Sequence, residues 1–462
     1  MTKHFRPRRN GAASSSQTLE AFGDYFSWPA ARLFGIVYLV GISNSIVGAI
    51  VVVGLLGWSL TGATQAIMAM SVVALLKFAN PAVASPPLLG TVLFWLVAMA
   101  AAGRLYMAAR HVSVPFVFLA AFALTAALLS VMVSKAVDVS VMKVVSFFIV
   151  SSGLLIVSNS LRSGEVLDLQ RWFFTAALVM AVLSVLTLPF PWIAFKTVAG
   201  SLQGMFNHPQ AAGVFYVPFA SWFIARVFLE RWAVLPRWVI ALSVLFAGMI
   251  VASGARTAML ATFVSVGLTL VIFLIRGRSS PANRTRGQII GFSVAMLGLA
   301  LVILFSGVLN EELEAIVYKG DEEAGGLTEA FQSARGAGVS MHIENFLDAP
   351  LTGHGFGVYR EGARHVTRFM GIPISASAEK GIVFTSVLEE VGAFGGLLFY
   401  GLLIAIIAAA AKGSTPGVLA MVIGTIAVNF GEAIFFATGG MGLFMWAVIG
   451  FGLARARVDR FR

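Results

Sequence analysis

The fold of this chain is decided by one polar stretch, Ser306 to Gly381, which reads SGVLNEELEAIVYKGDEEAGGLTEAFQSARGAGVSMHIENFLDAPLTGHGFGVYREGARHVTRFMGIPISASAEKG. A membrane interior excludes such a run, because each ionised side chain at bilayer depth is costly. Nearly everything on either side of it is apolar. The sequence therefore predicts one long extramembrane segment between two hydrophobic blocks, and this segment is the first place to look for a functional site.

The composition is that of an integral membrane protein. Of the 462 residues, 58% are hydrophobic and only 11% are charged, whereas soluble domains carry about 25% charged residues. Apolar runs recur that are long enough to cross a hydrocarbon core of roughly 30 Å, and backbone groups in lipid must be paired internally, which favours helices. The alternating pattern of a transmembrane β-barrel is missing. We therefore expect an all-α polytopic membrane protein with about 12 transmembrane helices and one long loop containing short helices.

The positive charges predict the orientation. The formal net charge is +11, and the basic residues gather in short loops and at the termini, which is typical of cytoplasmic segments and does not indicate a nucleic-acid partner. The loops in question are Arg276–Gly287, Glu230–Arg237, Arg162–Arg171 and Arg104–His111. This orientation places Ser306–Gly381 outside, in the periplasm of a Gram-negative cell. The chain has no cysteine, which excludes disulfides and thiolate metal ligands.

These signals divide the chain into five parts: a cytoplasmic basic arm (1–32), N-terminal transmembrane helices (33–305), a periplasmic loop (306–382), C-terminal transmembrane helices (383–453) and a cytoplasmic tail (454–462). Three apolar runs lie before Arg104, at Leu33–Trp58, Ala63–Ala79 and Leu88–Ala102. Because the basic arm and the Arg104 loop should both lie inside, an even number of crossings is needed between them. We expect two full crossings, with the third run partial, re-entrant or merged.

Arginines near the outer face are the first candidates for a binding site. Arg256 follows a short turn in VASGARTAML, and Arg360, Arg364 and Arg368 are spaced to share one helical face. A guanidinium presents a planar fork that suits phosphate oxygens. The pattern predicts an anionic, phosphate-bearing ligand, although a solvated basic face is the alternative for the three spaced arginines.

The second half of the loop has two further features. Arg335 to Leu347 predicts a short amphipathic helix with Val339, Ile343 and Phe346 on one face. Gly353, Gly355 and Gly357 then predict a glycine-rich turn that contains His354. No strand is expected before this turn, so a dinucleotide-binding fingerprint is rejected, and a tight loop lying on the membrane surface is the simpler interpretation.

Acidic residues close the loop and enter the next helix. Glu379 and Lys380 precede a helix that should begin near Val383, and Glu389 and Glu390 lie inside it, the first of them roughly 10 Å along at 1.5 Å per residue. Such carboxylates need a cation or a polar cavity. Glu389 could pair with Arg256, and Glu432, in VNFGEAIFF, could pair similarly; structural ion pairs and catalytic roles both stay open.

A metal site is not expected. His342 and Glu344 do not share a helix face, and no H-E-x-x-H motif is present. His208 and His111 stand alone, and His208 is assigned a supporting role at most.

The order of these features matches a family. An arginine follows a Ser-Gly turn, a long outer loop follows with DAPLTGHGFG in its second half, and the next helix carries LEEVGAFGGLLF. This resembles the O-antigen ligase and O-antigen polymerase superfamily over roughly Ser201 to Leu403. The resemblance implies a GT-C-like glycosyltransferase of the bacterial inner membrane. Such an enzyme transfers a glycan from undecaprenyl diphosphate to an acceptor glycan at the periplasmic face, with inversion and without a metal or other cofactor.

Site residues follow in part from this resemblance. Arg256 and Arg335 match the arginines with which the family binds the diphosphate. On the residues themselves, Arg360, Arg364 and Lys380 are further cations for it, Glu379, His354 and Arg335 are the catalytic candidates, and His208, Glu389 and Glu390 are supporting.

One departure bears on the reaction. The His-Asn pair of ligases would fall at Gly381, where no histidine stands. The chain therefore favours a polymerase that extends a surface polysaccharide over a ligase that transfers the glycan to lipid A-core. A lipid-linked sugar flippase is the alternative of another class, and it fits less well because polarity is concentrated in one outer loop.

Overall fold

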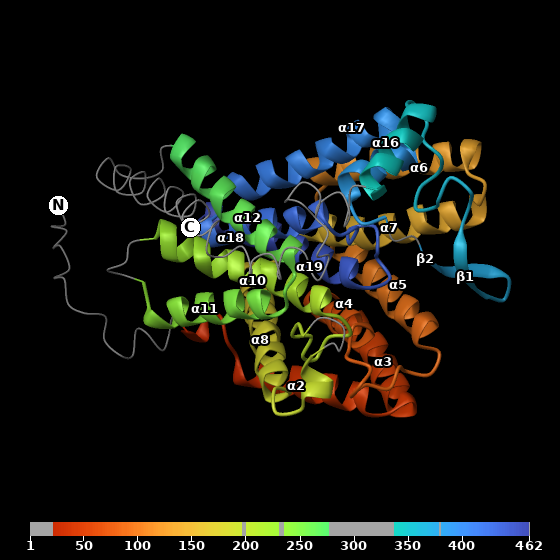
Figure 1. The fold of residues 1–462 in the computed structure, drawn as a ribbon. Coiled ribbons are helices and arrows are strands. Elements are labelled where there is room, and N and C mark those ends of the chain that lie inside the picture. The colour runs from red at the N-terminus through yellow and green to blue at the C-terminus, as the bar shows by residue number, and fades with distance from the viewer. Residues whose placement is uncertain (1–21, 196–199, 231–234, 277–336, 378–379, 462) are drawn as a thin grey trace, which may run out of the picture.

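The structure is a bundle of apolar helices (Figure 1). It is a computed structural model that describes residues 22–195, 200–230, 235–276, 337–377 and 380–461. Within these ranges 8 helices are long and apolar enough to cross a membrane: α5 (Gly90–Ala108), α6 (Val114–Val133), α7 (Val137–Val157), α8 (Ser163–Leu186), α10 (Pro209–Leu229), α12 (Arg256–Ile275), α17 (Val383–Ala411) and α19 (Met441–Arg460). The expected all-α membrane architecture is confirmed at this level.

Several predicted features lie outside the described residues. They are the span Ile289–Phe305, most of the basic loop after Arg276, the acidic first part of the outer loop, and the two candidates Arg335 and Glu379. The total of about 12 crossings therefore stays a prediction. At the ends of the described region, α2 begins at Trp28 and α19 runs to Arg460, so the helices extend beyond 33 and 453 on both sides.

The first hundred residues differ from the expectation. They hold four helices, namely α2 (Trp28–Ser43), α3 (Ser45–Leu60), α4 (Ala63–Lys77) and α5. The run Leu33–Trp58 is broken at Asn44, whose backbone is extended and whose side chain accepts a 2.8 Å hydrogen bond from the amide of Ile46. Asn44 thus caps α3, as short polar side chains do at helix starts. The run Leu33–Trp58 is therefore two helices rather than one, because this capping signal was missed, and the two full crossings with one partial run stay a prediction.

The ends of the helices lie at two opposite ends of the bundle. At one end, which we call the loop end, Lys143 of α7 reaches Gly357, and Trp95 of α5 donates to the carbonyl of Ile374. At the other, the basic end, Arg457 of α19 donates to the carbonyl of Asn159, and Arg276 to that of Ala411. The basic end carries Arg104, Arg110, Arg162, Arg171, Arg226, Arg237, Arg276, Lys412, Arg455, Arg457 and Arg460. Arg162 to Arg171 is nevertheless not a loop, because α8 begins at Ser163.

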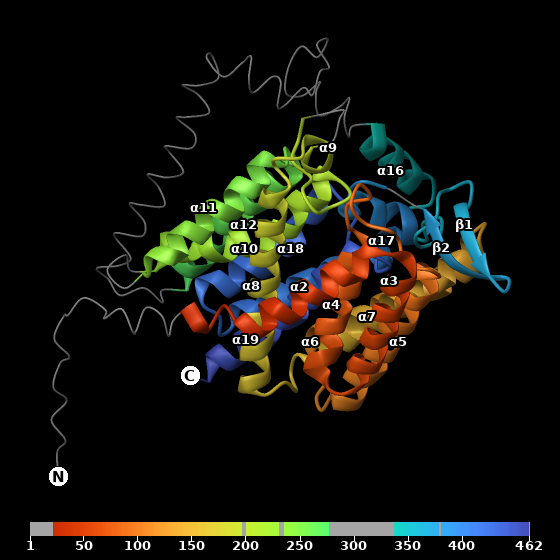
Figure 2. The ribbon, with the colours of Figure 1, turned by 90° about the horizontal axis from the view of Figure 1, so that it is seen from below.

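Short elements cover the loop end. Helix α16 (Ala337–Asp348) lies beside α17, and strands β1 (Arg364–Phe369) and β2 (Ile372–Ser377) form an antiparallel hairpin at the edge of the bundle, on the side away from α11 (Arg237–Ala252), as Figure 2 shows. The shared helical face predicted for Arg360, Arg364 and Arg368 is wrong, since Arg364 and Arg368 lie in β1. The β-branched Val366 and Thr367 favour a strand, and Gly371, with φ 82°, turns the chain back.

Helix α16 confirms the predicted helix from Ala337 onward, and its polar face points inward. His342 and Asn345 are buried, whereas Ile343 and Leu347 are exposed, the latter by 68%. His342 and Asn345 therefore face the loop end of the bundle, Ile343 and Leu347 face away from it, and Val339 and Phe346 are half-buried between the two sides.

Helix α17 is confirmed at Val383–Ala411 but is kinked at Gly392, where φ is 63° and ψ is −168°. The carbonyls of Glu389 and Glu390, freed by the kink, accept hydrogen bonds of 3.0 and 2.9 Å from the amides of His354 and Gly355. Residues 350–357, which we call the glycine strap, therefore insert into the kink. These glycines let the two backbones touch, so the strap packs into α17, and its place at the membrane surface stays a prediction.

An aromatic cluster ties the strap to the rest of the bundle. Phe356 lies 4.8 Å from Phe436, 5.8 Å from Phe147 and 5.9 Å from Phe122, measured between ring centroids. Phe436 belongs to the non-helical segment 431–440, which joins α18 (Pro416–Ala427) and the 3-10 turn η3 (Val428–Phe430) to α19. The cluster thereby places the strap and the 431–440 segment side by side at the loop end.

Candidate functional site

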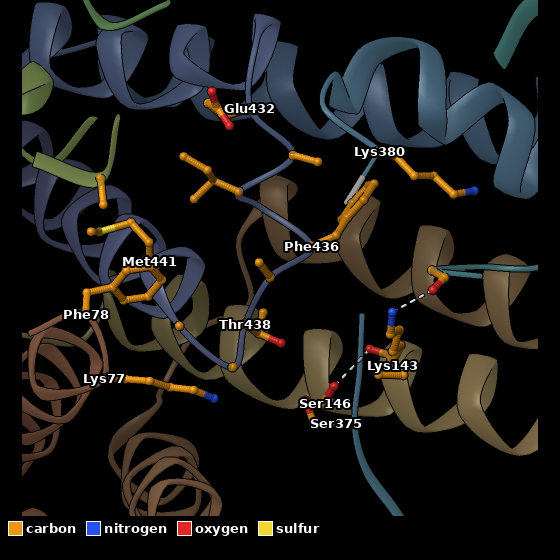
Figure 3. Close-up of a pocket in the computed structure, with 18 of the residues that line it drawn as sticks. Lys77, Phe78, Lys143, Ser146, Ser375, Lys380, Glu432, Phe436, Thr438 and Met441 are labelled. Atoms are coloured by element: carbon orange, nitrogen blue, oxygen red, sulfur yellow. Dashed lines mark hydrogen bonds between the residues drawn. The ribbon is translucent and has the colours of Figure 1, made fainter. Parts of the chain in front are cut away.

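A cavity of about 780 Å³ opens at the loop end (Figure 3). Its wall is built from the last turn of α4, the N-terminal parts of α5, α7, α10, α17 and α19, strand β2, the glycine strap and the 431–440 segment. Its charged and titratable side chains are Lys77, Lys143, Lys380, Glu390, Glu432 and His208. Three ammonium groups and two carboxylates thus face one space.

Lys380 is the most enclosed of the three lysines, with 6% of its surface exposed. Its Nζ lies 3.2 Å from Oε1 of Glu389 and 3.4 Å from Oε1 of Glu390. These are ion-pair distances, but the ammonium group makes no hydrogen bond of acceptable geometry within the described part of the protein. Because a buried donor without an acceptor is costly, the three N–H groups of Lys380 are suited to an anionic ligand in the cavity.

Glu389 is held from behind by α16. Its Oε2 lies 3.5 Å from Nε2 of His342, and its Oε1 accepts a 3.1 Å hydrogen bond from Asn345. His342 is 1% exposed, and its Nδ1 lies 2.9 Å from the hydroxyl of Thr385. Burial, followed by the charge of Lys380, lowers the pKa of His342 to about 4. His342 is therefore neutral at pH 7, and Glu389 pairs with Lys380 rather than with Arg256.

Glu390 and Lys143 hold the end of the glycine strap. Oε2 of Glu390 accepts a 2.9 Å hydrogen bond from the amide of Gly357, and Nζ of Lys143 donates 2.6 Å to the carbonyl of the same residue. Sequence reasoning missed Lys143 because it lies inside an apolar run. The signal was nevertheless present, since an ionisable residue within a predicted span is itself a functional candidate.

Lys77 lies apart from this cluster. It is the last residue of α4, its Nζ lies 4.9 Å from the centre of the Phe94 ring, and Gly439 is close to the ammonium group. No ion pair to a carboxylate is found for it among the residues that the structure describes. It was missed for the same reason as Lys143, because the predicted span Ala63–Ala79 includes it.

Helix ends add to the positive potential of the cavity. The wall includes His208 and Gln210 at the start of α10, Gly381 just before α17, and Met441 at the start of α19. A helix N-terminus carries partial positive charge and unpaired amides. Together with the hydrogen-bonding capacity of Lys380, this arrangement favours a ligand with negative charge.

The other predicted residues lie elsewhere. Arg256 begins α12 and is not part of the wall, although the next residue, Thr257, packs against Gly431, the neighbour of Glu432. Arg360 pairs with Asp348 on the outer surface.

Arg364 pairs with Glu361 at 3.5 Å, and its side chain is 62% exposed. Nε2 of His354 lies 2.9 Å from the carbonyl of Asn345, outside the cavity wall. The structure therefore brings Lys380, Glu390 and His208 into one cavity, with Glu389 behind them.

No protein-family model matches the sequence, and no curated protein matches it. The resemblance to the O-antigen ligase and polymerase superfamily therefore stays a prediction, and the site has to be interpreted from its own chemistry.

Proposed function

We propose that this protein is a membrane glycosyltransferase that uses an undecaprenyl diphosphate-linked glycan to extend a surface polysaccharide. The observation that carries the proposal is the cavity at the loop end, where three lysines and the starts of three helices face one space of about 780 Å³. Pockets of roughly 300–1,000 Å³ hold ligands the size of a diphosphate with its first sugars.

The location of the cavity suits a lipid-linked substrate. It lies where the membrane-spanning helices end, so a lipid tail can stay in the bilayer while its head group enters. Lys143 and Lys380 lie on one side of the space and Lys77 on another (Figure 3). Cations at these positions stabilise the charge that develops on a departing diphosphate. A diphosphate is already a stable anion, so no general acid is needed for its departure.

Among enzymes of this kind we prefer a chain-extending polymerase, because the His-Asn pair of ligases is missing at Gly381. The ligase that transfers glycan to lipid A-core is the nearest alternative. A flippase needs polar groups along a path through the membrane, whereas the cavity lysines gather at one end of the bundle. Periplasmic orientation, the inner membrane and a GT-C-like architecture are parts of the same proposal.

The test is reconstitution of the purified protein in liposomes with an undecaprenyl diphosphate-linked repeat unit, followed by mass spectrometry of the lipid-linked products. Chains that lengthen without another acceptor support the polymerase. Transfer only onto added lipid A-core indicates a ligase, and movement across the bilayer without bond formation indicates a flippase.

Substitution of the cavity lysines sharpens this test. Lys77→Gln and Lys143→Gln should each lower the rate of elongation about 100-fold, because each removes a charge that stabilises the leaving group. Lys412→Gln, at the basic end, is the matched control and should elongate like the wild type. Wild-type rates in both cavity variants would contradict the proposed role of the cavity.

A further inference from the structure

The lysines of the cavity account for only one end of the proposed donor. They suit its diphosphate, whereas a space of about 780 Å³ is large enough to hold the attached sugar as well. A pyranose presents C–H groups on its faces and hydroxyls around its rim. A subsite for it therefore needs an aromatic or apolar face beside side chains that form hydrogen bonds.

Trp95 supplies an aromatic surface of fixed orientation. It lies in the second turn of α5, is half-buried and belongs to the cavity wall. Its indole N–H donates a 3.0 Å hydrogen bond to the carbonyl of Ile374 in β2, and its ring packs edge-on against Phe94, with 5.4 Å between the ring centroids. Because these contacts fix the ring before a ligand arrives, little conformational entropy is lost on binding.

The indole lies next to one of the cavity lysines. Cζ2 of Trp95 and Nζ of Lys77 are both 3.6 Å from the position that a Cβ would take at Gly439. A diphosphate that pairs with Lys77 therefore brings the group bonded to it close to Trp95. In the proposed donor the isoprenoid is bonded to one phosphate and the sugar to the other, so the sugar can lie against the indole while the tail runs the opposite way.

Hydrogen-bonding side chains complete this part of the wall. The same cavity is lined by the amides of Asn207 and Gln210 and the hydroxyls of Ser375 and Thr438, the last two of which are labelled in Figure 3. Amides and hydroxyls both donate and accept hydrogen bonds, as the hydroxyls of a sugar do. Ser375 follows Ile374 in β2, so one strand positions a hydroxyl and also the acceptor that anchors the indole.

We propose that Trp95 is the platform of a sugar subsite, on which the sugar bonded to the diphosphate of the donor stacks, an inference that rests on the proposed function for its ligand. The C–H groups of the sugar face the negative π-surface of the indole. Its hydroxyls reach the amides and hydroxyls of the wall. The subsite thereby holds the sugar in a defined position relative to the lysines that bind the diphosphate.

The test measures binding of two lipids to the purified protein in nanodiscs: undecaprenyl diphosphate linked to the repeat unit, and undecaprenyl diphosphate without a sugar. Trp95→Phe keeps an aromatic face and Trp95→Leu removes it. Both variants lose the hydrogen bond to Ile374, so the difference between them isolates stacking. Trp95→Leu should bind the sugar-bearing lipid about tenfold more weakly than the wild type, and Trp95→Phe within about threefold of it.

The lipid without a sugar reports on the diphosphate site alone. Both variants should bind it within about twofold of the wild type, because the cavity lysines are unchanged. Trp192→Leu is the matched control, since Trp192 is 69% exposed and lies outside the cavity wall. It should bind both lipids as the wild type does.

Three results would overturn the subsite while elongation by the wild type leaves the proposed function in place. They are wild-type affinity of Trp95→Leu for the sugar-bearing lipid, equal weakening of both lipids, and a Trp95→Phe protein as weak as Trp95→Leu. The last two would show that the indole supports the wall rather than a sugar. A wild type that gives the expected binding pattern but lengthens no chains would overturn the transfer reaction and leave the sugar subsite standing.

Discussion

Lys380 and His342 show how single residues shape the site. Lys380 is balanced by Glu389 and Glu390, and His342 closes the space behind Glu389 without adding charge. Because desolvation keeps His342 neutral, it adds no charge to this buried cluster at pH 7. Protonation of His342 would add a second buried cation beside Lys380, so the cluster resists it.

The stability of the folded protein should therefore fall in acid. The pKa of His342 is lowered from its ordinary value to about 4, so between pH 6.5 and 4 the unfolded chain binds a proton that the folded chain refuses. The contribution of His342 is fully present above pH 6.5 and is lost as the pH falls towards 4, by on the order of 3 kcal/mol. Melting temperatures in detergent across this range should drop more steeply for the wild type than for His342→Gln.

The control for this prediction is His365→Gln, because His365 is an exposed histidine on β1. This variant should follow the wild-type curve. Superimposable pH curves for the wild type and His342→Gln would contradict the assignment of His342 as a buried neutral group.

The sequence identified site residues only where polar residues stood next to a long apolar run. Lys380, Glu389 and Glu390 stood out because they border an apolar run. Lys77 and Lys143 did not, because hydropathy averaged over a span hides a single charge. Arg256, Arg360 and Arg364 were prominent in the sequence, yet the wall of the cavity is formed by other cations, since the chain path between α16 and α17 decides which side chains point inward.

At the scale of elements, the decisive contact is between the glycine strap and the kink of α17. A Cβ added at Gly353 would overlap the backbone of Glu390, and one added at Gly392 would overlap that of Leu351. Both glycines also have positive φ, which side chains disfavour. The contact holds Glu389 and Glu390 beside the cavity, because both residues belong to the turn of α17 that contains the kink.

Gly392→Ala and Gly353→Ala should therefore each destabilise the fold, by about 3 kcal/mol from overlap and backbone strain. Both variants should also lose elongation activity, since the carboxylates that hold Lys380 would move. Gly267→Ala is the matched control, as it lies in α12 with open space around it. Thermal unfolding of the three variants checks the prediction, and a Gly392→Ala protein as stable as the control would count against it.

The elements themselves were only partly predictable. The apolar length of α17 marked it clearly, and its kink did not show, because Gly392 gains its role from a partner distant in sequence. The hairpin β1–β2 was mistaken for a helix since the spacing of three arginines outweighed the β-branched residues between them. The N-terminal run was broken by Asn44, a local capping signal that hydropathy alone does not register.

At the scale of the whole molecule, charge separates the two ends of the bundle. Most of the arginines near helix ends lie at the basic end. The loop end carries the cavity together with α16 and the hairpin. The gathering of basic residues at one end was predictable, because these residues stand out at the ends of the apolar runs. The depth of the cavity was not, because it arises where segments far apart in sequence meet.

Because the chain has no cysteine, single cysteines can be introduced to measure which end of the bundle faces the cytoplasm. Glu361→Cys places a thiol at the loop end, and His111→Cys places one at the basic end. On the proposed inner-membrane location and periplasmic orientation, a membrane-impermeant maleimide added to cells with a permeabilised outer membrane should label Glu361→Cys and leave His111→Cys unlabelled until the inner membrane is opened. The reverse pattern would show that the loop end faces the cytoplasm.

The contact between the glycine strap and α17 also restricts how the sequence can change during evolution. Neither Gly353 nor Gly392 can change alone, and a change in one is not relieved by a change in the other, because both would add atoms to the same gap. The two positions are therefore constrained as a unit for as long as the fold persists. Homologues too divergent to align along their helices should still carry the paired signature, Gly353-x-Gly355-x-Gly357 followed by Glu389-Glu390-x-Gly392, and that signature is the means of finding them.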